Sequence, residues 1–314
     1  MAINVTYSRG VERMTGYMHP CYAESLSEFG TPRELPRCKG WVLERRIPGF
    51  AERDAMCCYP LFVCQDWSQL HSDLETLGSE LVSLALVTDP FGRYDRDCLN
   101  RCFEHVVPFK EHFVVDLKQQ PDNHVSEHHR RYVRKGLQHV TVERCGEPID
   151  FIDEWAALYR ELILRHGIKG MTAFSKESFA KQLFVPGLVM FRAVSDDKTL
   201  GMLLWYVQGD VAYYHLGSTS PRGLELHASF ALFSFALKYF ADNGLRWLEL
   251  GAGAGIAGDG TDGLTRFKRG WSTGTRTVYF CGRIFDPERY AEIVTAKGIT
   301  VTDYFPAYRK GEFT

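Results

Sequence analysis

The chain has 314 residues, enough for one large domain or two of ordinary size. Hydrophobic residues make up 45% and charged residues 24% of the sequence, which are the proportions of a soluble globular protein and argue against long disordered regions. The formal net charge of -2 excludes a general attraction to nucleic acid or membrane, so any anion-binding role must depend on local clusters.

The nine cysteines show no spacing typical of a zinc site. Cys57 and Cys58 are adjacent, and Cys98 and Cys102 are four apart without further ligands nearby. We therefore expect reduced thiols, no metal and a cytoplasmic location. The opening residues MAINVTYSRG lack the basic and apolar segments of a signal peptide, and no window approaches eighteen apolar residues.

The first hundred residues predict an α/β unit. Apolar runs indicate strands at 41–47, 60–64 and 81–87, with a polar turn at 52–54 between the first two. A helix is expected at 68–77, capped by Ser68 and ended by Gly78, followed by a helix at 97–103 and a strand at 112–117.

The middle of the chain predicts helices that lead into an antiparallel meander. Helices are expected at 128–137, 154–166 and 175–184, the last capped by Ser175, with a short strand at 140–143. Three strands follow at 188–194, 200–207 and 211–217, and the turn Gln208-Gly209-Asp210 joins the last two as a hairpin.

The stretch 200–271 organises the rest of the chain. After the meander come a buried helix at 227–241, apolar on all sides, and a short strand at 247–250. A strand, a crossover helix and a second strand form a parallel unit, whose switch point is where open sheets place ligands. A last strand is expected at 277–284.

Two glycine-containing segments suggest ligand sites. LELGAGAG at 248–255 is similar to the loop that holds S-adenosylmethionine in methyltransferases, but only about sixty residues follow it, whereas that loop follows the first strand of a sheet. The segment 218–227 begins the buried helix, where free N–H groups and the helix dipole favour an anion.

Residues 113–271 resemble the FemAB-like and BioF2-like acyltransferases, which carry a GNAT fold. The resemblance depends on an ordered set of motifs: FVVDL at 113–117, HHRRYVRKGLQHVTVE at 128–143, LYRELILRHG at 158–167, VAYYHLGST at 211–219, LELG at 248–251 and GLTRFKRGW at 263–271. It implies an α/β fold of two tandem GNAT-like lobes with a mixed, mainly antiparallel sheet. We expect a degenerate N-terminal lobe at 1–115 and a catalytic lobe at 116–314.

The resemblance implies a role for a lysine in the last motif. Lys268 would lie in the active site and neutralise a phosphate or stabilise an oxyanion, although a surface lysine is the alternative. Glu249 is a candidate base for the acceptor amine, or else a solvated carboxylate. His215 is a third catalytic candidate, although its strand points it away from Tyr214 and a core histidine would look the same.

Binding residues are assigned on the same basis. GNAT acyltransferases hold the pyrophosphate of coenzyme A at the turn before the buried helix, where this chain has Arg222, Gly223, Leu226 and His227 and matches half of the usual pattern. The remaining candidates are substrate-binding residues, with a solvated helix face and core packing as alternatives: Tyr214, Arg131, Arg134, Phe267 and Trp271.

The resemblance implies transfer of an acyl group from an acyl-CoA to an amine on an amino sugar, a peptide or a small metabolite, by direct attack. Aminoacyl-tRNA is the alternative donor, as in FemAB proteins, and would make tRNA a partner. A ligand-binding protein that kept the fold without catalysis is the third hypothesis, which the half-matched Arg222-Gly223 turn favours.

Overall fold

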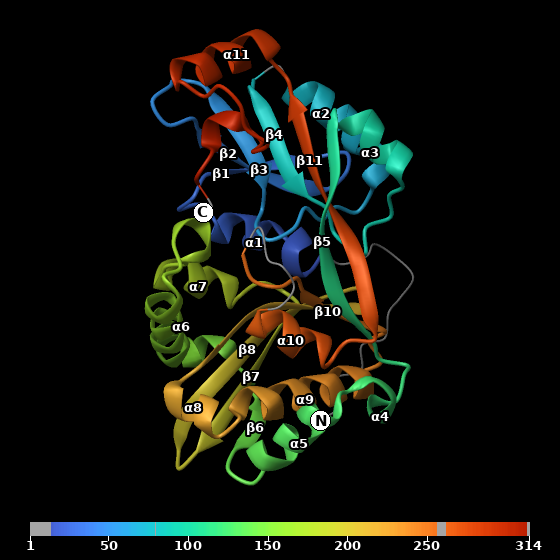
Figure 1. Ribbon diagram of the computed structural model, residues 1–314, viewed down its shortest axis with the longest axis vertical. Helices are drawn as coiled ribbons and strands as arrows, with labels where there is room; N and C mark the ends of the chain where they lie inside the picture. Colours follow the sequence, from blue (N-terminus) through green and yellow to red (C-terminus); the bar gives the residue numbers. More distant parts are fainter. Residues whose placement is uncertain (1–13, 79, 256–261, 313–314) are drawn as a thin grey trace.

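One sheet of eleven strands runs through the length of the molecule, in a computed structural model that describes residues 14–78, 80–255 and 262–312 (Figure 1). The strands lie in the order β1-β2-β3-β4-β11-β5-β10-β9-β8-β7-β6. Their bounds are β1 (Thr31–Leu35), β2 (Gly40–Arg46), β3 (Arg53–Cys57), β4 (Ser83–Val87), β5 (His105–Asp116), β6 (Thr141–Arg144), β7 (Leu188–Ser195), β8 (Lys198–Gln208), β9 (Val211–Thr219), β10 (Trp247–Gly251) and β11 (Gly274–Ile284).

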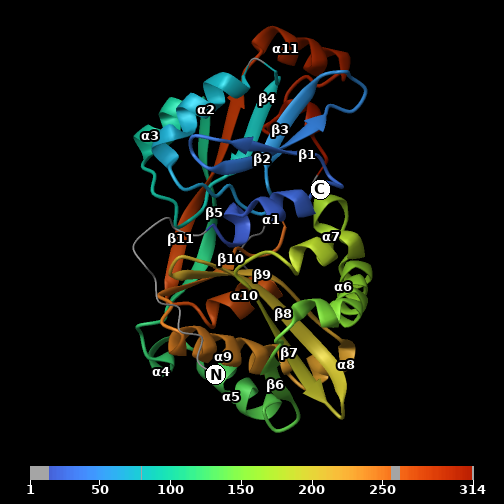
Figure 2. The same cartoon turned by 180° about the vertical axis from the view of Figure 1, so that it is seen from behind.

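Helices cover the sheet on both faces. They are α1 (Pro20–Ser25), α2 (Leu70–Leu77), α3 (Arg96–Cys102), α4 (Pro121–His124), α5 (Glu127–Gly136), α6 (Ile152–His166), α7 (Lys176–Gln182), α8 (Pro221–Glu225), α9 (Ala228–Asp242), α10 (Gly263–Arg269) and α11 (Pro287–Ala296). Apolar residues of α1, α6 and α7 share one core with the sheet, and those of α5, α9 and α10 share another. Helix α11 lies at the end of the molecule opposite to α5 and α9 (Figure 2). None of the helices in the described ranges is long and apolar enough to cross a membrane.

The sheet is mixed and mainly antiparallel, which confirms the predicted fold class. Its two parallel pairs are β3 with β4 and β9 with β10, and the chain between the strands of each pair forms a helix. Between these pairs β11 lies beside β4, and β5 lies beside β10. Each half of the chain thus places a strand in the other half of the sheet, and the division at 115/116 stays a prediction.

Helix α9 lies between two layers, as its apolar composition predicts. Leu232 and Phe240 are fully buried, and the helix packs against both the sheet and α5. Gly136 at the end of α5 lies so close that a Cβ atom there would come within 2.9 Å of the carbonyl oxygen of His227. The position therefore needs glycine because a side chain would push the two helices apart.

Three local predictions in the first hundred residues are wrong. Arg53 and Asp54 of the expected turn at 52–54 belong to β3, and the expected strand at 60–64 has only an isolated bridge between Phe62 and Thr88. The polar pair Arg53-Asp54 suggested a turn, but Asp54 is fully buried because Arg309, 255 residues later, forms an ion pair with it. Ser68 is not the helix cap either, since Asp66 accepts the hydrogen bond from its backbone N–H.

Candidate active site at the separation of two strands

Strands β9 and β10 pair over only three residues and then separate. The parallel register ends at Glu249 opposite Tyr213, while β9 continues to Thr219. On its other side β9 has a bulge, because His215 has no partner between two consecutive pairs with β8. This is the switch point that the sequence predicts for the active site.

Lys268 lies where the two strands separate. Its Nζ donates a hydrogen bond of 2.6 Å to the carbonyl oxygen of Ala252, directly after β10, and lies 5.7 Å from the ring centroid of Tyr214 on β9. The side chain comes from α10, whose first turn is capped by Asp262 through the N–H of Thr265 at 2.9 Å. Lys268 is only 6% exposed, so it is not the surface lysine that the basic run allowed.

Burial lowers the pKa of Lys268 from 10.5 to about 8. Glu249 opposes this shift because its negative charge favours the ammonium, while the positive charge of Lys110 adds to it. Lys110 projects from β5 and donates a hydrogen bond to the carbonyl oxygen of Gly255. Lys268 is therefore mainly a cation at pH 7, but one that loses its proton more easily than a solvated lysine.

Glu249 is held by two hydrogen bonds. Its Oε1 accepts from His112 Nδ1 at 2.8 Å and from the backbone N–H of Gly251 at 2.6 Å. Glu249 is only 3% exposed, so it is not the solvated carboxylate of the alternative interpretation. Sequence reasoning assigned no role to His112, because its partner Glu249 lies 137 residues later in the chain.

Gly251 lies between the two charged side chains. Its N–H binds Glu249, and a Cβ atom at this position would come within 3.0 Å of Lys268 Nζ. Its φ of +74° is also one that glycine adopts without strain. Gly251, the first glycine of the GAGAG run, therefore lets the Glu249 carboxylate and the Lys268 ammonium both approach the backbone. This contact accounts for the glycine without a bound nucleotide.

His215 lies on the opposite face of the sheet from Tyr214. Its Nε2 donates to Gln182 Oε1 at 3.0 Å, and its Nδ1 accepts from the Tyr17 hydroxyl at 3.1 Å. Burial lowers the pKa of His215 to about 3, so the ring is neutral. The structure places it among apolar and aromatic residues of the core that contains α6 and α7, apart from Lys268.

The buried carboxylate of Asp89, from the first half of the chain, lies on the same face of the sheet as His215. Both oxygens of Asp89 accept from the hydroxyl of Tyr213, at 3.0 and 3.1 Å. Burial raises the pKa of Asp89 to about 7, and the charge of Glu249 adds to the shift. Sequence reasoning assigned neither residue, because the pair joins positions 124 apart.

The turn between β9 and α9 contains the short helix α8. Arg222 points outward and pairs with Glu225 at 2.8 Å, with both side chains well exposed. The N–H of Gly223 donates to Ser220 Oγ at 3.1 Å, and a Cβ atom on Gly223 would overlap the carbonyl oxygen of Leu200. Gly223 therefore allows the turn to pack closely against Leu200. Its N–H already donates to Ser220, so it is not available to bind a phosphate.

The start of α9 lies beside the basic helix α5. His227 precedes α9 with a left-handed φ of 59° and makes no side-chain cap, and its ring lies 4.4 Å from that of Tyr132. Burial lowers the pKa of His227, and the nearby Lys135, His139 and His128 lower it further. The two segments that the sequence assigned to anion binding therefore meet, with Leu226 packed against the core beside them.

Arg134 and Trp271 line a separate cavity of about 680 Å³ between α4, α5 and α9. Arg131 is exposed on α5 and is not part of this lining. Trp271 is 1% exposed, and the ring centroid of Phe267 lies 4.9 Å from that of Phe233. Both Trp271 and Phe267 therefore belong to the core around α9. Their binding role stays a prediction.

Within residues 14–78, 80–255 and 262–312 there is no group of three or more His, Cys, Asp or Glu side chains placed to hold a metal ion. All nine cysteines are unpaired, and eight of them are buried.

Comparisons with known proteins concern the domain family and the fold. The model of the acetyltransferase (GNAT) domain family matches residues 123–269. No curated protein matches the sequence. Among solved structures, FemX is similar with a TM-score of 0.64 and 14% identity, covering 87% of this chain and 93% of that one.

Two further structures have the same fold over nearly their whole length. The C-terminal domain of a putative lysylphosphatidylglycerol synthetase from Agrobacterium fabrum has a TM-score of 0.61 and 14% identity, covering 92% of both chains. L-PGS from Bacillus licheniformis has a TM-score of 0.53 and 13% identity, covering 91% of this chain and 97% of that one. Residues 123–269 therefore match the acetyltransferase (GNAT) domain family, and the chain shares its fold with FemX.

Proposed function

We propose that the chain transfers an acyl group from an acyl-CoA to an amine, where β9 and β10 separate. The observation that carries the proposal is the buried ammonium of Lys268 beside the hydrogen-bonded carboxylate of Glu249. A buried cation and a buried carboxylate on either side of one glycine are costly to maintain, and such pairs are typical of active sites.

The two groups suit the two charges that change during acyl transfer. The amine nitrogen forms a bond to the thioester carbonyl carbon, and the carbonyl oxygen becomes negative in the tetrahedral intermediate. Lys268 stabilises this oxyanion. Glu249 accepts the proton that the nitrogen loses. The C–S bond then breaks, the carbonyl re-forms, and the thiolate leaves and takes up a proton.

His112 is a positioning residue in this proposal. A carboxylate oxygen can only accept, so His112 carries its proton on Nδ1 and donates it to Glu249 Oε1. This bond and the N–H of Gly251 both use Oε1, so we assign Oε2 as the oxygen that receives the substrate proton.

The start of α9 is our candidate for the pyrophosphate of coenzyme A. The helix dipole favours an anion there, and the neighbouring Lys135 and His227 add positive charge or N–H donors. Arg222 is less suited to this role because Glu225 already pairs with it. The acceptor is an amine on an amino sugar, a peptide or a small metabolite.

Aminoacyl-tRNA is the second candidate donor. Helix α5 exposes Arg131, Arg134 and Lys135 near the start of α9, and a basic helix face favours a phosphate backbone. The likeness to FemX concerns the fold alone at 14% identity. A tRNA bound through many backbone phosphates would lose affinity more steeply with salt than acyl-CoA, which has only its pyrophosphate and 3′-phosphate.

Thermal melting with acetyl-CoA in excess tests the donor class first. A ligand at about a hundred times its dissociation constant stabilises a protein by roughly 2.7 kcal/mol, so we expect a shift of several degrees. No shift with acetyl-CoA or longer acyl-CoAs would contradict the proposal and lead to a transfer assay with charged tRNA.

Thiol release from acetyl-CoA in the presence of a panel of amines tests the site. Lys268→Ala should lose turnover while the protein stays folded, and Lys176→Ala, on an exposed lysine of α7, should change neither property. Unchanged turnover in Lys268→Ala would overturn the site assignment.

A further inference from the structure

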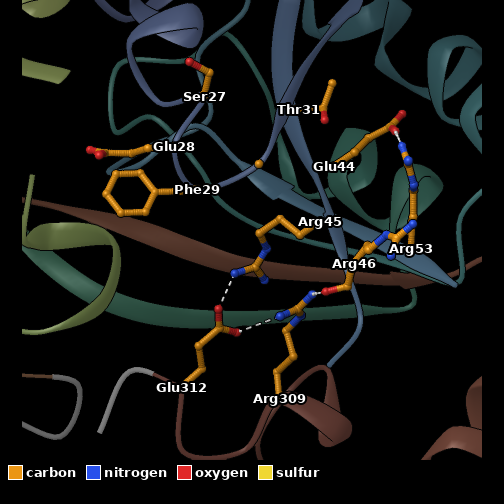
Figure 3. A pocket seen from close by; sticks show the side chains of 11 residues that line it. Ser27, Glu28, Phe29, Thr31, Glu44, Arg45, Arg46, Arg53, Arg309 and Glu312 are labelled. Atoms are coloured by element: carbon orange, nitrogen blue, oxygen red, sulfur yellow. Dashed lines mark hydrogen bonds and ion pairs between the residues drawn. The ribbon is translucent and has the colours of Figure 1, made fainter. Parts of the chain in front are cut away.

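A second charged pocket lies in the other half of the molecule, between the end of α1, strands β1 to β3 and the segment after α11. Its volume is about 490 Å³, and its walls are mainly polar (Figure 3). The charged side chains that line it are Glu28, Arg45, Arg46, Arg53, Arg309, Glu44 and Glu312. None of them takes part in the proposed acyl transfer.

One wall is a fixed ion pair between Arg309 and Asp54. Arg309 Nε and Nη2 donate to the two oxygens of Asp54 at 2.5 and 2.7 Å, and Nη2 also donates to the carbonyl oxygen of Arg46 at 2.9 Å. Asp54 is fully buried and Arg309 is 7% exposed. A bidentate, buried pair neutralises both charges, so Arg309 is anchored and needs no further anion.

Arg45 is different because its buried charge depends on a residue at the pocket edge. Its side chain is 9% exposed, and its Nη1 donates to Glu312 Oε1. The Nε has no hydrogen-bond partner in the described part of the chain, and it lies 4.0 Å from an Asp54 oxygen that Arg309 already binds. The Nε is enclosed, so in the described part of the chain Arg45 depends on Glu312 for its one hydrogen bond, and losing that partner without a replacement would be costly.

Glu312 reaches between two arginines from the segment that follows Arg309. One of its oxygens accepts from Arg45, and the other accepts from Arg309 Nη1 at 3.4 Å. The side chain remains 31% exposed, so the carboxylate can leave without unpacking the core. Arg46 and Arg53 are exposed at the same pocket, and Arg53 shares Glu44 with Arg33. Without Glu312 the pocket would have a surplus of positive charge.

We propose that this pocket binds the carboxylate of a small acidic molecule or peptide, and that Glu312 occupies the carboxylate position when that ligand is absent. The ligand carboxylate would take the place of Glu312 at Arg45 Nη1, where the planar guanidinium binds a carboxylate more specifically than a lysine ammonium would. The polar walls select a hydrophilic ligand. The proposal does not depend on the acyl-transfer assignment.

Calorimetric titration of the full chain tests this with two acidic probes, succinate and the C-terminal amide of N-acetyl-Gly-Glu, and with the C-terminal amide of N-acetyl-Gly-Gln as a matched neutral control. Glu312→Gln removes the internal competitor, so we expect roughly tenfold tighter binding of at least one acidic probe than in the wild type, and no binding of the neutral control. Tighter binding of succinate alone would identify a small acid, and of the dipeptide alone a peptide.

A second variant keeps the interpretation specific. Arg45→Lys retains the charge but loses the guanidinium edge, so Glu312→Gln combined with Arg45→Lys should lose the gain in affinity. Equal affinity of the wild type and Glu312→Gln for both acidic probes would overturn the proposal and leave Glu312 a structural ion-pair partner. The thiol-release assay should be unchanged in Glu312→Gln, because the acyl-transfer site is in the other half of the molecule.

Discussion

Replacing Lys268 by methionine separates what this residue does for activity from what it does for stability. Methionine has a similar length and no charge, so it removes the ammonium while filling the space between β9 and β10. We expect the variant to lose most of its turnover. We also expect its free energy of unfolding at pH 7 to be equal to that of the wild type or higher.

The magnitude follows from the pKa of Lys268. Its fall from 10.5 to about 8 means that the folded protein disfavours the charged form, and since one pKa unit corresponds to about 1.4 kcal/mol, charging the buried amine costs about 3 kcal/mol. Methionine avoids this cost but leaves the carbonyl oxygen of Ala252 without its donor, which costs about 1–3 kcal/mol. The net change at pH 7 therefore lies between zero and a stabilisation of about 2 kcal/mol.

The pH dependence provides the sharper test. Between pH 8 and 10.5 the unfolded chain keeps a proton on Lys268 that the folded chain has lost, so the stability contribution of this lysine rises with pH. The advantage of Lys268→Met should therefore shrink by about 3 kcal/mol across this window. Urea denaturation of the two proteins from pH 7 to 10 measures it, with Lys176→Met as a control that should show no such trend. A stability difference that stays constant over this range would refute the reasoning.

Three further outcomes follow from the site. Because the ammonium of Lys268 is the active form, kcat should fall as the pH rises through about 8, and an acyl-transfer pH profile that stays flat to pH 10 would contradict this. His112→Phe should lower kcat by about 10- to 100-fold with little change in KM, while His112→Asn, which keeps an N–H donor for Glu249, should recover part of the loss; equal kinetics for both variants would remove His112 from its positioning role. Gly223→Ala should destabilise the fold by about 1–3 kcal/mol in urea denaturation, since its methyl group would overlap the carbonyl oxygen of Leu200, and a stability equal to that of the wild type would show that the turn adapts.

The candidate site was predictable where it depends on chain order. The strand that contains Glu249 and the helix that contains Lys268 follow one another closely, so their motifs already indicated a shared site. His112 was not predictable, because it lies 137 residues before Glu249 and reaches it only through the pairing of β5 with β10. A lone histidine in a strand has no local signal for its partner.

Local composition also led to a wrong prediction in the first hundred residues. Asp54 lies beside Arg53 in a stretch of charged residues, a composition typical of a turn, yet both belong to β3. The ion pair with Arg309 makes burial of the Asp54 carboxylate tolerable. No residue near position 54 in the sequence indicates this pairing.

By itself, the sequence determined the period of its apolar residues, and with it the meander β7 to β9, the buried helix α9 and the fold class. These features depend on interactions between residues that are close in the sequence, so the pattern within each segment is enough to predict them. Only the tertiary structure decided that β5 and β11 lie between the two parallel pairs, and that the carboxylate of Glu249 meets His112 on one side and the charge of Lys268 on the other. Such contacts join distant segments. Their energy comes from burial and charge pairing, which exist only once the strands have assembled into the sheet.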